Sequence, residues 1–410
     1  MSVFYGLVQS KGRIFYKNLL QFVFRCAILF TELKTRSEGD FEMKLIICGD
    51  LSVTNASAEA FAKQDKDAAF ADVQGLFADA DRVIVNLECA LTDSENRIKK
   101  CGPNLKGPKT TADTLKAAGV TDCTLSNNHI FDFGKEGAHD TLDQLNRVGL
   151  GYTGYGANYE DSRKNMYLEC DGIKVGIVNV CEHEYTYALE NREGARPFDE
   201  FETMEDIREA KKNADRVIVV YHGGKEHCRY PSPRLMKACR EMVRCGADVV
   251  LCQHSHCIGC FETFEGGHIL YGQGNFHFPK YFDTEMWNEG LVACLDVTKD
   301  GVKVEYVPIQ STSTGIRLAT DEERERIIAD LLVRNGQILD GSWREGWREF
   351  CQSQAHHYKK YMAGVHREGG HYTMQDGPDE YQMFAHFLDC EAHTDVWREL
   401  YKTYNYTNEI

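Results

Sequence analysis

The stretch Met43-Lys44-Leu45-Ile46-Ile47-Cys48-Gly49-Asp50 indicates how the chain is built. Its apolar run has the length of a strand and is typical of a strand buried on both faces. A glycine and an aspartate follow at once, so the strand ends in a turn that carries a carboxylate. The same order, a buried strand followed by a short polar cluster, recurs along the chain.

From this strand onward, apolar runs of strand length alternate with helical patterns. The predicted strands are Leu45–Cys48, Val83–Val85, Cys123–Leu125, Lys174–Val180, Val217–Tyr221 and Val249–Cys252. The predicted helices are Ala58–Ala80, Thr111–Ala118, Ala138–Val148, Met204–Ala214 and Leu235–Arg244. Three later runs lack intervening helices and are expected to be antiparallel strands: His268–Tyr271, Gly290–Val297 and Val302–Pro308. The pattern predicts an α/β fold, a two-sheet sandwich flanked by helices over residues 43–310.

The two ends of the chain differ in composition from this region. Residues 1–42 hold six basic and four acidic residues, and Arg25 interrupts their apolar run. This N-terminal extension is interpreted as disordered or not native, with a signal peptide or an interfacial helix as alternatives. Residues 320–410 are rich in charged and aromatic residues and are expected to form helices packed on the main domain.

Charge and cysteine content narrow the function classes. The 410 residues include 47 Lys and Arg against 63 Asp and Glu, a net charge of −16, which argues against a nucleic-acid binder. The 16 cysteines in a chain of this length favour reduced thiols and a cytoplasmic location, with cell-surface or secreted locations as alternatives. Cys257 and Cys260 form a lone pair, which is weak evidence for zinc. No stretch predicts a stable transmembrane anchor.

Polar clusters follow the predicted strands, where open α/β sheets bind ligands. They are Gly49-Asp50, Asn86-Leu87-Glu88, Ser126-Asn127-Asn128-His129, His222-Gly223-Gly224-Lys225-Glu226, Gln253-His254-Ser255-His256 and Tyr271-Gly272-Gln273-Gly274-Asn275-Phe276. His254 and His256 should share one side of an extended segment, because side chains alternate there. Together the clusters offer carboxylate, amide and imidazole groups. This chemistry suits one or two divalent ions of the Mn, Zn or Fe class, with a further histidine free to protonate a leaving oxygen.

The order and spacing of these motifs, from Lys44 to about Pro308, resemble the CapA family of poly-γ-glutamate capsule-synthesis proteins, which is itself similar to the calcineurin-like metallophosphoesterases. The resemblance implies a metallophosphoesterase-like fold and assigns roles to individual residues. The implied metal ligands are Asp50, Glu88, Asn128, His222, His254 and His256. His129 matches the catalytic histidine, and Asp132 is grouped with it as a catalytic candidate. The candidates for substrate binding are Lys106, Glu226 and Asn275.

The sequence departs from the general phosphoesterase pattern at three positions. Ser52 stands where that pattern has a histidine, Glu88 where it has a bridging aspartate, and Gln253 where it has a glycine. The leading hypothesis is a metal-dependent hydrolase of a phosphoester or of an amide bond in polyglutamate, linked to capsule or cell-surface polymer synthesis. The alternatives are a non-catalytic metal-binding component of poly-γ-glutamate synthesis or export, and a scaffold with a degenerate site. The expected substrate is a small molecule or a polyanionic polymer.

Because residues 1–42 differ from the rest in charge and composition, we expect them to be dispensable for folding. A chain that starts at Met43 should keep the single cooperative thermal transition of the full chain, measured by circular dichroism. Loss of that transition would show that the N-terminal segment belongs to the folded unit.

Overall fold

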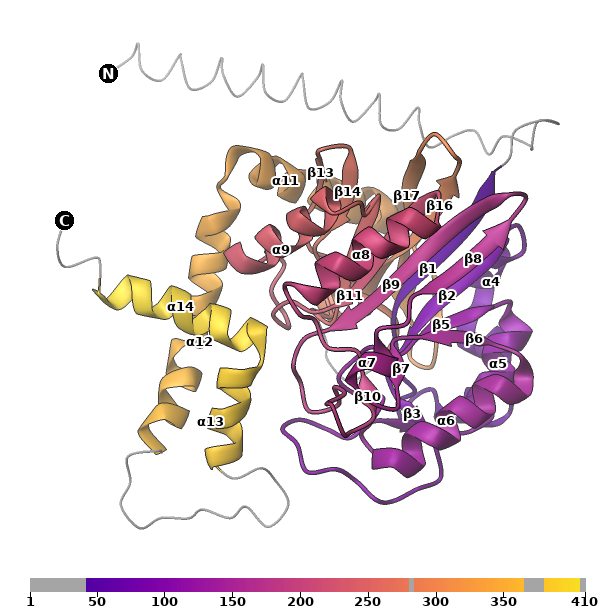
Figure 1. The fold of residues 1–410 in the computed structure, drawn as a ribbon, viewed down its shortest axis with the longest axis horizontal. Coiled ribbons are helices and arrows are strands. Elements are labelled where there is room, and N and C mark those ends of the chain that lie inside the picture. Colours follow the sequence, from indigo (N-terminus) through magenta and orange to yellow (C-terminus); the bar gives the residue numbers. More distant parts are fainter. Residues whose placement is uncertain (1–41, 280–283, 365–379, 406–410) are drawn as a thin grey trace. The chain divides into compact units, whose positions relative to one another are not determined.

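The computed structural model describes residues 42–279, 284–364 and 380–405, and its core is a pair of mixed β-sheets packed face to face (Figure 1). The first sheet has the order β18-β17-β16-β1-β2-β5-β6, and β15 also pairs with β1. Its strands are β1 (Met43–Leu51), β2 (Arg82–Leu87), β5 (Asp122–Thr124), β6 (Gly151–Thr153), β15 (Asn275–His277), β16 (Glu289–Val297), β17 (Val302–Ser311) and β18 (Ile316–Leu318).

The second sheet has the order β13-β14-β12-β11-β9-β8. Its strands are β8 (Met166–Cys170), β9 (Ile173–Cys181), β11 (Arg216–His222), β12 (Val249–Gln253), β13 (Phe261–Phe264) and β14 (Gly267–Leu270). Two short strand pairs lie outside both sheets: β3 (Ala90–Leu91) with β4 (Lys106–Gly107), and β7 (Tyr155–Gly156) with β10 (Gly194–Ala195).

Alternation along the buried strands divides the core into three layers. In β1, Leu45 and Ile47 face the second sheet, whereas Ile46 and Cys48 face helices on the outer side. In β11, Ile218 lies between the sheets and faces the first one. This is the predicted α/β sandwich flanked by helices, and the fold class is confirmed.

Helices cover the outer face of each sheet (Figure 1). The first sheet carries α2 (Ala58–Ala62), α3 (Lys66–Phe70), the 3-10 turn η1 (Ala71–Val73), α4 (Gln74–Phe77), α5 (Thr111–Ala118) and α6 (Gly134–Val148). The second carries α8 (Glu202–Asn213), α9 (Pro233–Arg244), α12 (Trp343–Gly364), α13 (Glu380–Asp389) and α14 (Glu391–Asn405). The remaining helices are α7 (Tyr159–Ser162), α10 (Glu285–Asn288) and α11 (Asp321–Asp340).

Three details differ from the predictions. The single helix expected over 58–80 is broken into α2, α3, η1 and α4, because Gln64 and Ala71 adopt positive φ values of 58° and 41° that no α-helix continues through. The strand expected at His268–Tyr271 was predicted to be antiparallel, but β14 runs parallel to β12 and antiparallel only to β13. The strands β8 and β13, which add the two edges of the second sheet, were not predicted.

The division into domains stays a prediction. The last strand, β18, ends at Leu318 and α11 begins at Asp321, so the change from strands to helices falls close to residue 320. The predicted N-terminal extension lies outside the described residues except for Glu42. Aromatic residues of the C-terminal helices, including Trp343 and Trp347, are buried in the same cluster as Val219 of β11.

Two glutamines join the sheets where β1 becomes irregular. The register of β1 against β2 shifts between Ile47 and Asp50. There the Gln253 amide donates to the carbonyl oxygen of Cys48 at 3.0 Å, and the Gln273 amide donates to that of Ile47 at 2.7 Å. The two side chains also bond to each other at 3.1 Å. Gln253, which departs from the general phosphoesterase pattern, therefore links β12 to β1 through its side-chain amide.

We expect Gln273→Ala to lower the free energy of unfolding by about 1–3 kcal/mol, because it removes the donor to the buried carbonyls of Ile47 and Leu291. Urea unfolding of the full chain measures the loss. The exposed Gln352 of α12 provides the control, since Gln352→Ala should change stability by less than about 0.5 kcal/mol. Equal stability of the two variants would contradict the proposed link.

Candidate metal centre

The carboxyl ends of strands from both sheets bring six predicted ligands into one buried cluster. The first sheet supplies Asp50 at the end of β1, Glu88 just after β2 and Asn128 after β5. The second sheet supplies His222, the last residue of β11, together with His254 and His256 after β12. Because parallel strands end at the same sheet edge, residues far apart in sequence meet here. Their roles as ligands stay predictions.

His222 lies at the centre of this cluster. Its Nδ1 atom is 3.4 Å from Asp50 Oδ1, and its Nε2 atom is 3.5 Å from Glu88 Oε1. The same Nε2 atom lies 3.0 Å from Asn128 Oδ1 and 3.2 Å from His254 Nδ1. Burial would lower the pKa of His222, but the carboxylates of Glu88 and Asp50 outweigh it and raise the pKa to about 10. The two carboxylates therefore stabilise a positive charge on or beside the His222 imidazole.

Asp50 is held by groups on three sides. It accepts hydrogen bonds from the Asn86 amide at 2.7 Å and from the backbone N–H of His254 at 2.8 Å. Its Oδ2 atom is also 3.8 Å from His256 Nδ1. Burial would raise the pKa of Asp50, but the neighbouring imidazoles lower it to about 2, so the side chain is a carboxylate at neutral pH.

Glu88 provides the test of whether these residues fit a metal ion. The residue is fully buried, and neither carboxylate oxygen accepts a hydrogen bond from the described residues. Such a group is costly to bury unless a cation or a set of donors compensates it. Ligand atoms of Glu88, His222 and His254 lie within 4.8 Å of one another, as do those of Asp50, Glu88 and His256. The donor set of carboxylate and imidazole groups therefore fits divalent ions of the predicted class.

The two histidines after β12 were expected in an extended segment, and that expectation is wrong. His254 and His256 have φ values of 74° and 52°, so they lie in a turn. Left-handed backbone in residues other than glycine costs on the order of 1–3 kcal/mol each and is found at functional sites. His254 reaches His222 and His256 reaches Asp50 despite the turn. Burial lowers the pKa of His254 to about 4, so its imidazole is neutral at neutral pH.

His129 and Asp132 form a hydrogen-bonded pair beside the cluster. Asp132 Oδ2 lies 2.6 Å from His129 Nδ1, which leaves His129 Nε2 directed toward Glu88, 4.0 Å from Oε1. The buried Lys100 donates to the other Asp132 oxygen at 2.7 Å and to the Asn128 carbonyl at 2.7 Å. Burial would raise the pKa of Asp132, but His129 and Lys100 lower it. An anionic Asp132 fixes the orientation of the imidazole through this hydrogen bond.

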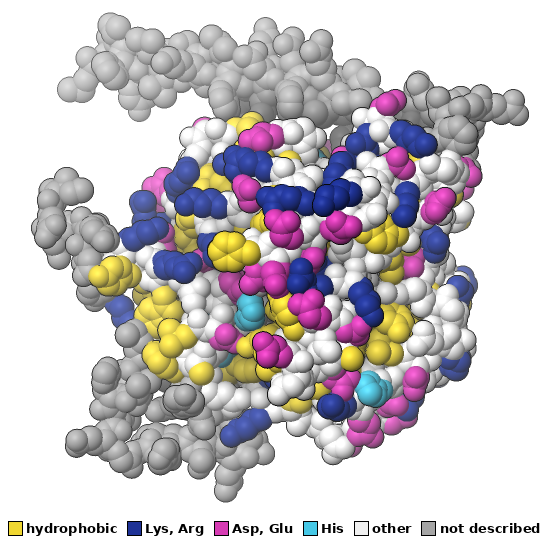
Figure 2. All heavy atoms as spheres, viewed as in Figure 1, with side chains coloured by type: hydrophobic (Ala, Val, Ile, Leu, Met, Phe, Trp, Pro, Cys, Tyr) yellow, Lys and Arg dark blue, Asp and Glu magenta, His cyan; other side chains and the backbone are white. Residues whose placement is uncertain are grey.

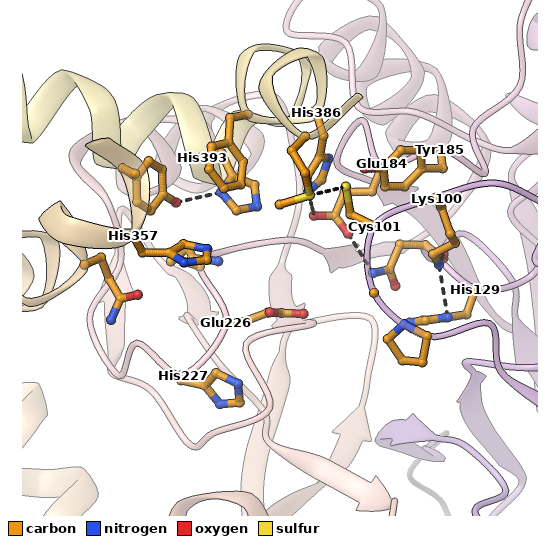
Figure 3. A pocket seen from close by; sticks show the side chains of 18 of the residues that line it. Lys100, Cys101, His129, Glu184, Tyr185, Glu226, His227, His357, His386 and His393 are labelled. Atoms are coloured by element: carbon orange, nitrogen blue, oxygen red, sulfur yellow. Dashed lines mark hydrogen bonds and ion pairs between the residues drawn. The ribbon is translucent and has the colours of Figure 1, made fainter. Parts of the chain in front are cut away.

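A cavity of about 290 Å³ opens onto Asn128 and His129 (Figure 3). Residues of the loops after β9 and β11 line one part of it, and residues of α12, α13 and α14 line another. Figure 3 shows Glu184, Glu226 and His227 on the sheet side, with His357, His386 and His393 on the helical side. The C-terminal helices are therefore part of the wall of this cavity.

The three candidates for substrate binding lie in different places. Glu226 lines the cavity; burial would raise its pKa, but Lys225 and His254 lower it to about 2. Asn275 lies next to the cluster, 2.9 Å from His256 Nδ1. Lys106 is not among the residues that line the cavity. Its ammonium contacts Glu95 Oε1 at 2.6 Å instead. The roles of all three stay predictions.

Sequence reasoning missed several residues that surround the cluster. Asn86 was quoted only as part of a motif, yet it bonds to Asp50 and lies 3.0 Å from His222 Nδ1. Glu184 accepts a hydrogen bond from the Asn128 amide at 2.7 Å. Like the predicted ligands, it follows the end of a buried strand, here β9, so the same pattern could have indicated it. Lys100 and His386 carry no such signal, because neither follows a strand.

One face of the molecule carries charged side chains of both signs (Figure 2). On the face drawn in Figure 2, Lys and Arg side chains are interspersed with Asp and Glu. Such mixing differs from the continuous basic surface that nucleic-acid binding requires. Within the described part of the chain, every helix is too short or too polar to span a membrane.

Comparison with known proteins gives a family match over the part of the chain that holds the cluster. Residues 44–280 match the family described as bacterial capsule synthesis protein PGA_cap. The chain is 28% identical over 274 residues to the capsule biosynthesis protein CapA of Bacillus anthracis, covering 65% of this chain and 64% of that protein. It is 29% identical over 268 residues to the PGA biosynthesis protein CapA of Bacillus subtilis, covering 64% and 70%. The chain thus spans just under two thirds of the length of the Bacillus anthracis protein.

Solved structures give only remote likenesses. A hypothetical protein from Thermus thermophilus is 16% identical with a TM-score of 0.40, covering 64% of this chain and 99% of that chain. A putative 5'-nucleotidase from Staphylococcus aureus is 16% identical with a TM-score of 0.41, covering 71% and 58%.

We expect Glu88→Gln to abolish stabilisation of the protein by Mn²⁺ at the cluster, because the amide keeps the shape but removes the charge. For the original chain, a metal concentration of 100 times Kd should add about 2.7 kcal/mol to the free energy of unfolding. Thermal unfolding with and without Mn²⁺ measures this difference. The exposed Glu205→Gln serves as the control and should keep the shift. A full metal shift in Glu88→Gln would contradict the assignment.

Proposed function

We propose that this chain, which belongs to the bacterial capsule synthesis protein PGA_cap family, is a metal-dependent hydrolase that acts in the synthesis of a capsule-type polymer. The proposal extends the family membership to a chemical activity. One observation carries it: the buried Glu88 carboxylate, without a hydrogen-bond donor among the described residues, lies between the histidine cluster and the His129–Asp132 pair.

The cluster and the pair have separable tasks. Asp50, Glu88, Asn128, His222, His254 and His256 would hold one or two divalent ions. Such ions, when bound, supply Lewis acidity and an activated water. The His129–Asp132 pair adds an imidazole that is not needed to hold a metal ion. His129 Nδ1 bonds to Asp132, and His129 Nε2 is directed toward Glu88. That arrangement suits proton donation to a leaving oxygen or nitrogen.

Lys100 supports the pair rather than the substrate. Its side chain is 2% exposed and its ammonium contacts Asp132 at 2.7 Å, so its charge is already matched. It also lies 3.2 Å from His129 Nδ1. Lys100 therefore keeps Asp132 anionic and the imidazole in one orientation. We assign it a positioning role.

The cavity favours an anionic substrate. Lys225 lines it, is only partly buried, and its ammonium forms neither a hydrogen bond nor an ion pair with another described residue. An ammonium without a direct ion pair beside a catalytic cluster can bind a carboxylate or a phosphoryl group. The relatives' names refer to a capsule and to PGA biosynthesis. We therefore propose a glutamyl amide bond in a carboxylate-rich polymer, or a phosphoester of a related intermediate, as the bond that is cut.

The second candidate is a non-catalytic metal-binding component of polymer synthesis or export. Ser52 favours it, because a serine at this position removes a nitrogen ligand that the general phosphoesterase pattern has. In this case the cluster would bind metal and polymer, and the His129–Asp132 pair would have no chemical task.

The substitution His129→Ala separates the two candidates. For the hydrolase, it should lower kcat by about 10²–10⁴ while the bound metal stays constant, because general acid catalysis contributes a factor of that size. The assays are hydrolysis of a γ-glutamyl oligomer and of a generic phosphodiester with Mn²⁺, with metal content measured on the same samples.

The matched control is His356→Ala, since this histidine is exposed on α12 and does not line the cavity. It should leave rate and metal content unchanged. A chain that binds metal and polymer but cuts neither substrate, with or without His129, would refute the hydrolase proposal and support the second candidate.

A further inference from the structure

A second group of side chains that could hold a metal ion lies on the cavity wall next to the first cluster (Figure 3). It consists of Glu184 from the loop after β9, His386 from α13 and His393 from α14. Ligand atoms of these three residues lie within 4.8 Å of one another. Both histidines are outside residues 44–280, the part of the chain that matches the family.

Glu184 presents one oxygen to this group. Its Oε2 atom accepts the Asn128 amide at 2.7 Å, which fixes the carboxylate. Its Oε1 atom faces His386 Nε2 at 3.7 Å and His254 Nε2 at 3.9 Å, too far for hydrogen bonds. The remaining contact of Oε1 is the weak thiol donor of Cys390 at 3.4 Å. This oxygen is thus held in place between imidazoles without a strong donor among the described residues.

The imidazoles are also oriented for ligation. The hydroxyl of Tyr358 lies 2.6 Å from His393 Nδ1, which leaves Nε2 as the atom available to an ion. A hydrogen bond donated by the other ring N–H, here from Nδ1 to the Tyr358 oxygen, is the usual way in which proteins orient a metal-binding histidine. Tyr358 belongs to α12, so three helices converge on this point.

We propose that Glu184, His386 and His393 bind a divalent transition metal ion, with Zn²⁺ as the best match, at a site that adjoins the Glu88 cluster but has its own three ligands. Two imidazoles and one carboxylate form a donor set that zinc uses in proteins when a fourth position stays open. Here the open position would face the cavity that Lys225 and Glu226 line. The ion would also join α13 and α14 to the sheets, since Glu184 is the only one of its ligands on the sheet side.

The test uses the full chain with Glu88→Gln, so that the first cluster does not mask the second. Equilibrium dialysis with Zn²⁺ and elemental analysis should give one bound ion per chain in Glu88→Gln. The double variant Glu88→Gln/His386→Gln should lose that ion. The control Glu88→Gln/His356→Gln should keep it.

Hydrogen exchange supplies a readout that does not depend on hydrolysis. In Glu88→Gln, Zn²⁺ should slow amide exchange in α13 and α14 about tenfold or more, because the ion fastens these helices to the β9 loop. In Glu88→Gln/His386→Gln, the same addition should leave exchange unchanged. Should the double variant not fold, an anomalous-scattering map of zinc-loaded Glu88→Gln decides the question by a peak between Glu184 and His393.

The proposal is overturned if the Glu88→Gln and Glu88→Gln/His386→Gln chains bind equal amounts of Zn²⁺, or if the anomalous map has no peak at this position. Neither result bears on the hydrolase proposal, which rests on His129 and on the first cluster. Conversely, an inactive first cluster would leave the ion at Glu184 in place.

Discussion

The structure depends on a concentration of negative charge that is enclosed by both sheets. Asp50 and Glu88 are fully buried, and only Asp50 has hydrogen-bond donors among the described residues. The protein meets this cost by ending strands of two sheets at the same place, so that imidazoles from β11 and β12 reach carboxylates from β1 and β2. The sandwich is thus the means by which opposite charges from distant parts of the sequence come together.

Most of this arrangement could be predicted from the sequence, because it follows from local rules. Buried strands have continuous apolar runs, and polar groups that follow them meet at one sheet edge. Such rules locate Asp50, Glu88 and His222. They do not locate Lys100, which stands in a basic run typical of an exposed surface, or Lys106, whose ammonium pairs with Glu95. Whether a lysine is buried depends on tertiary packing, which spacing along the chain does not record.

The position of the C-terminal helices also depends on tertiary packing that the sequence pattern does not record. Their aromatic residues indicated helices that pack on the main domain, but no pattern indicated that His386 and His393 reach the cavity. Sequence similarity to the family stops before them. The family match therefore carries no information on the helical residues that line the cavity.

The pairing of β1 with β16 has a consequence for synthesis of the protein. β1 is among the first strands to leave the ribosome, yet its partner on one side is Glu289–Val297, in register from Met43 opposite Val297. At about 5–20 residues per second, translation needs on the order of ten seconds or more to supply that partner. During this interval a long apolar edge strand stays open, and such edges invite pairing with other chains. The nascent protein therefore has a defined period in which one edge of β1 lacks its native partner.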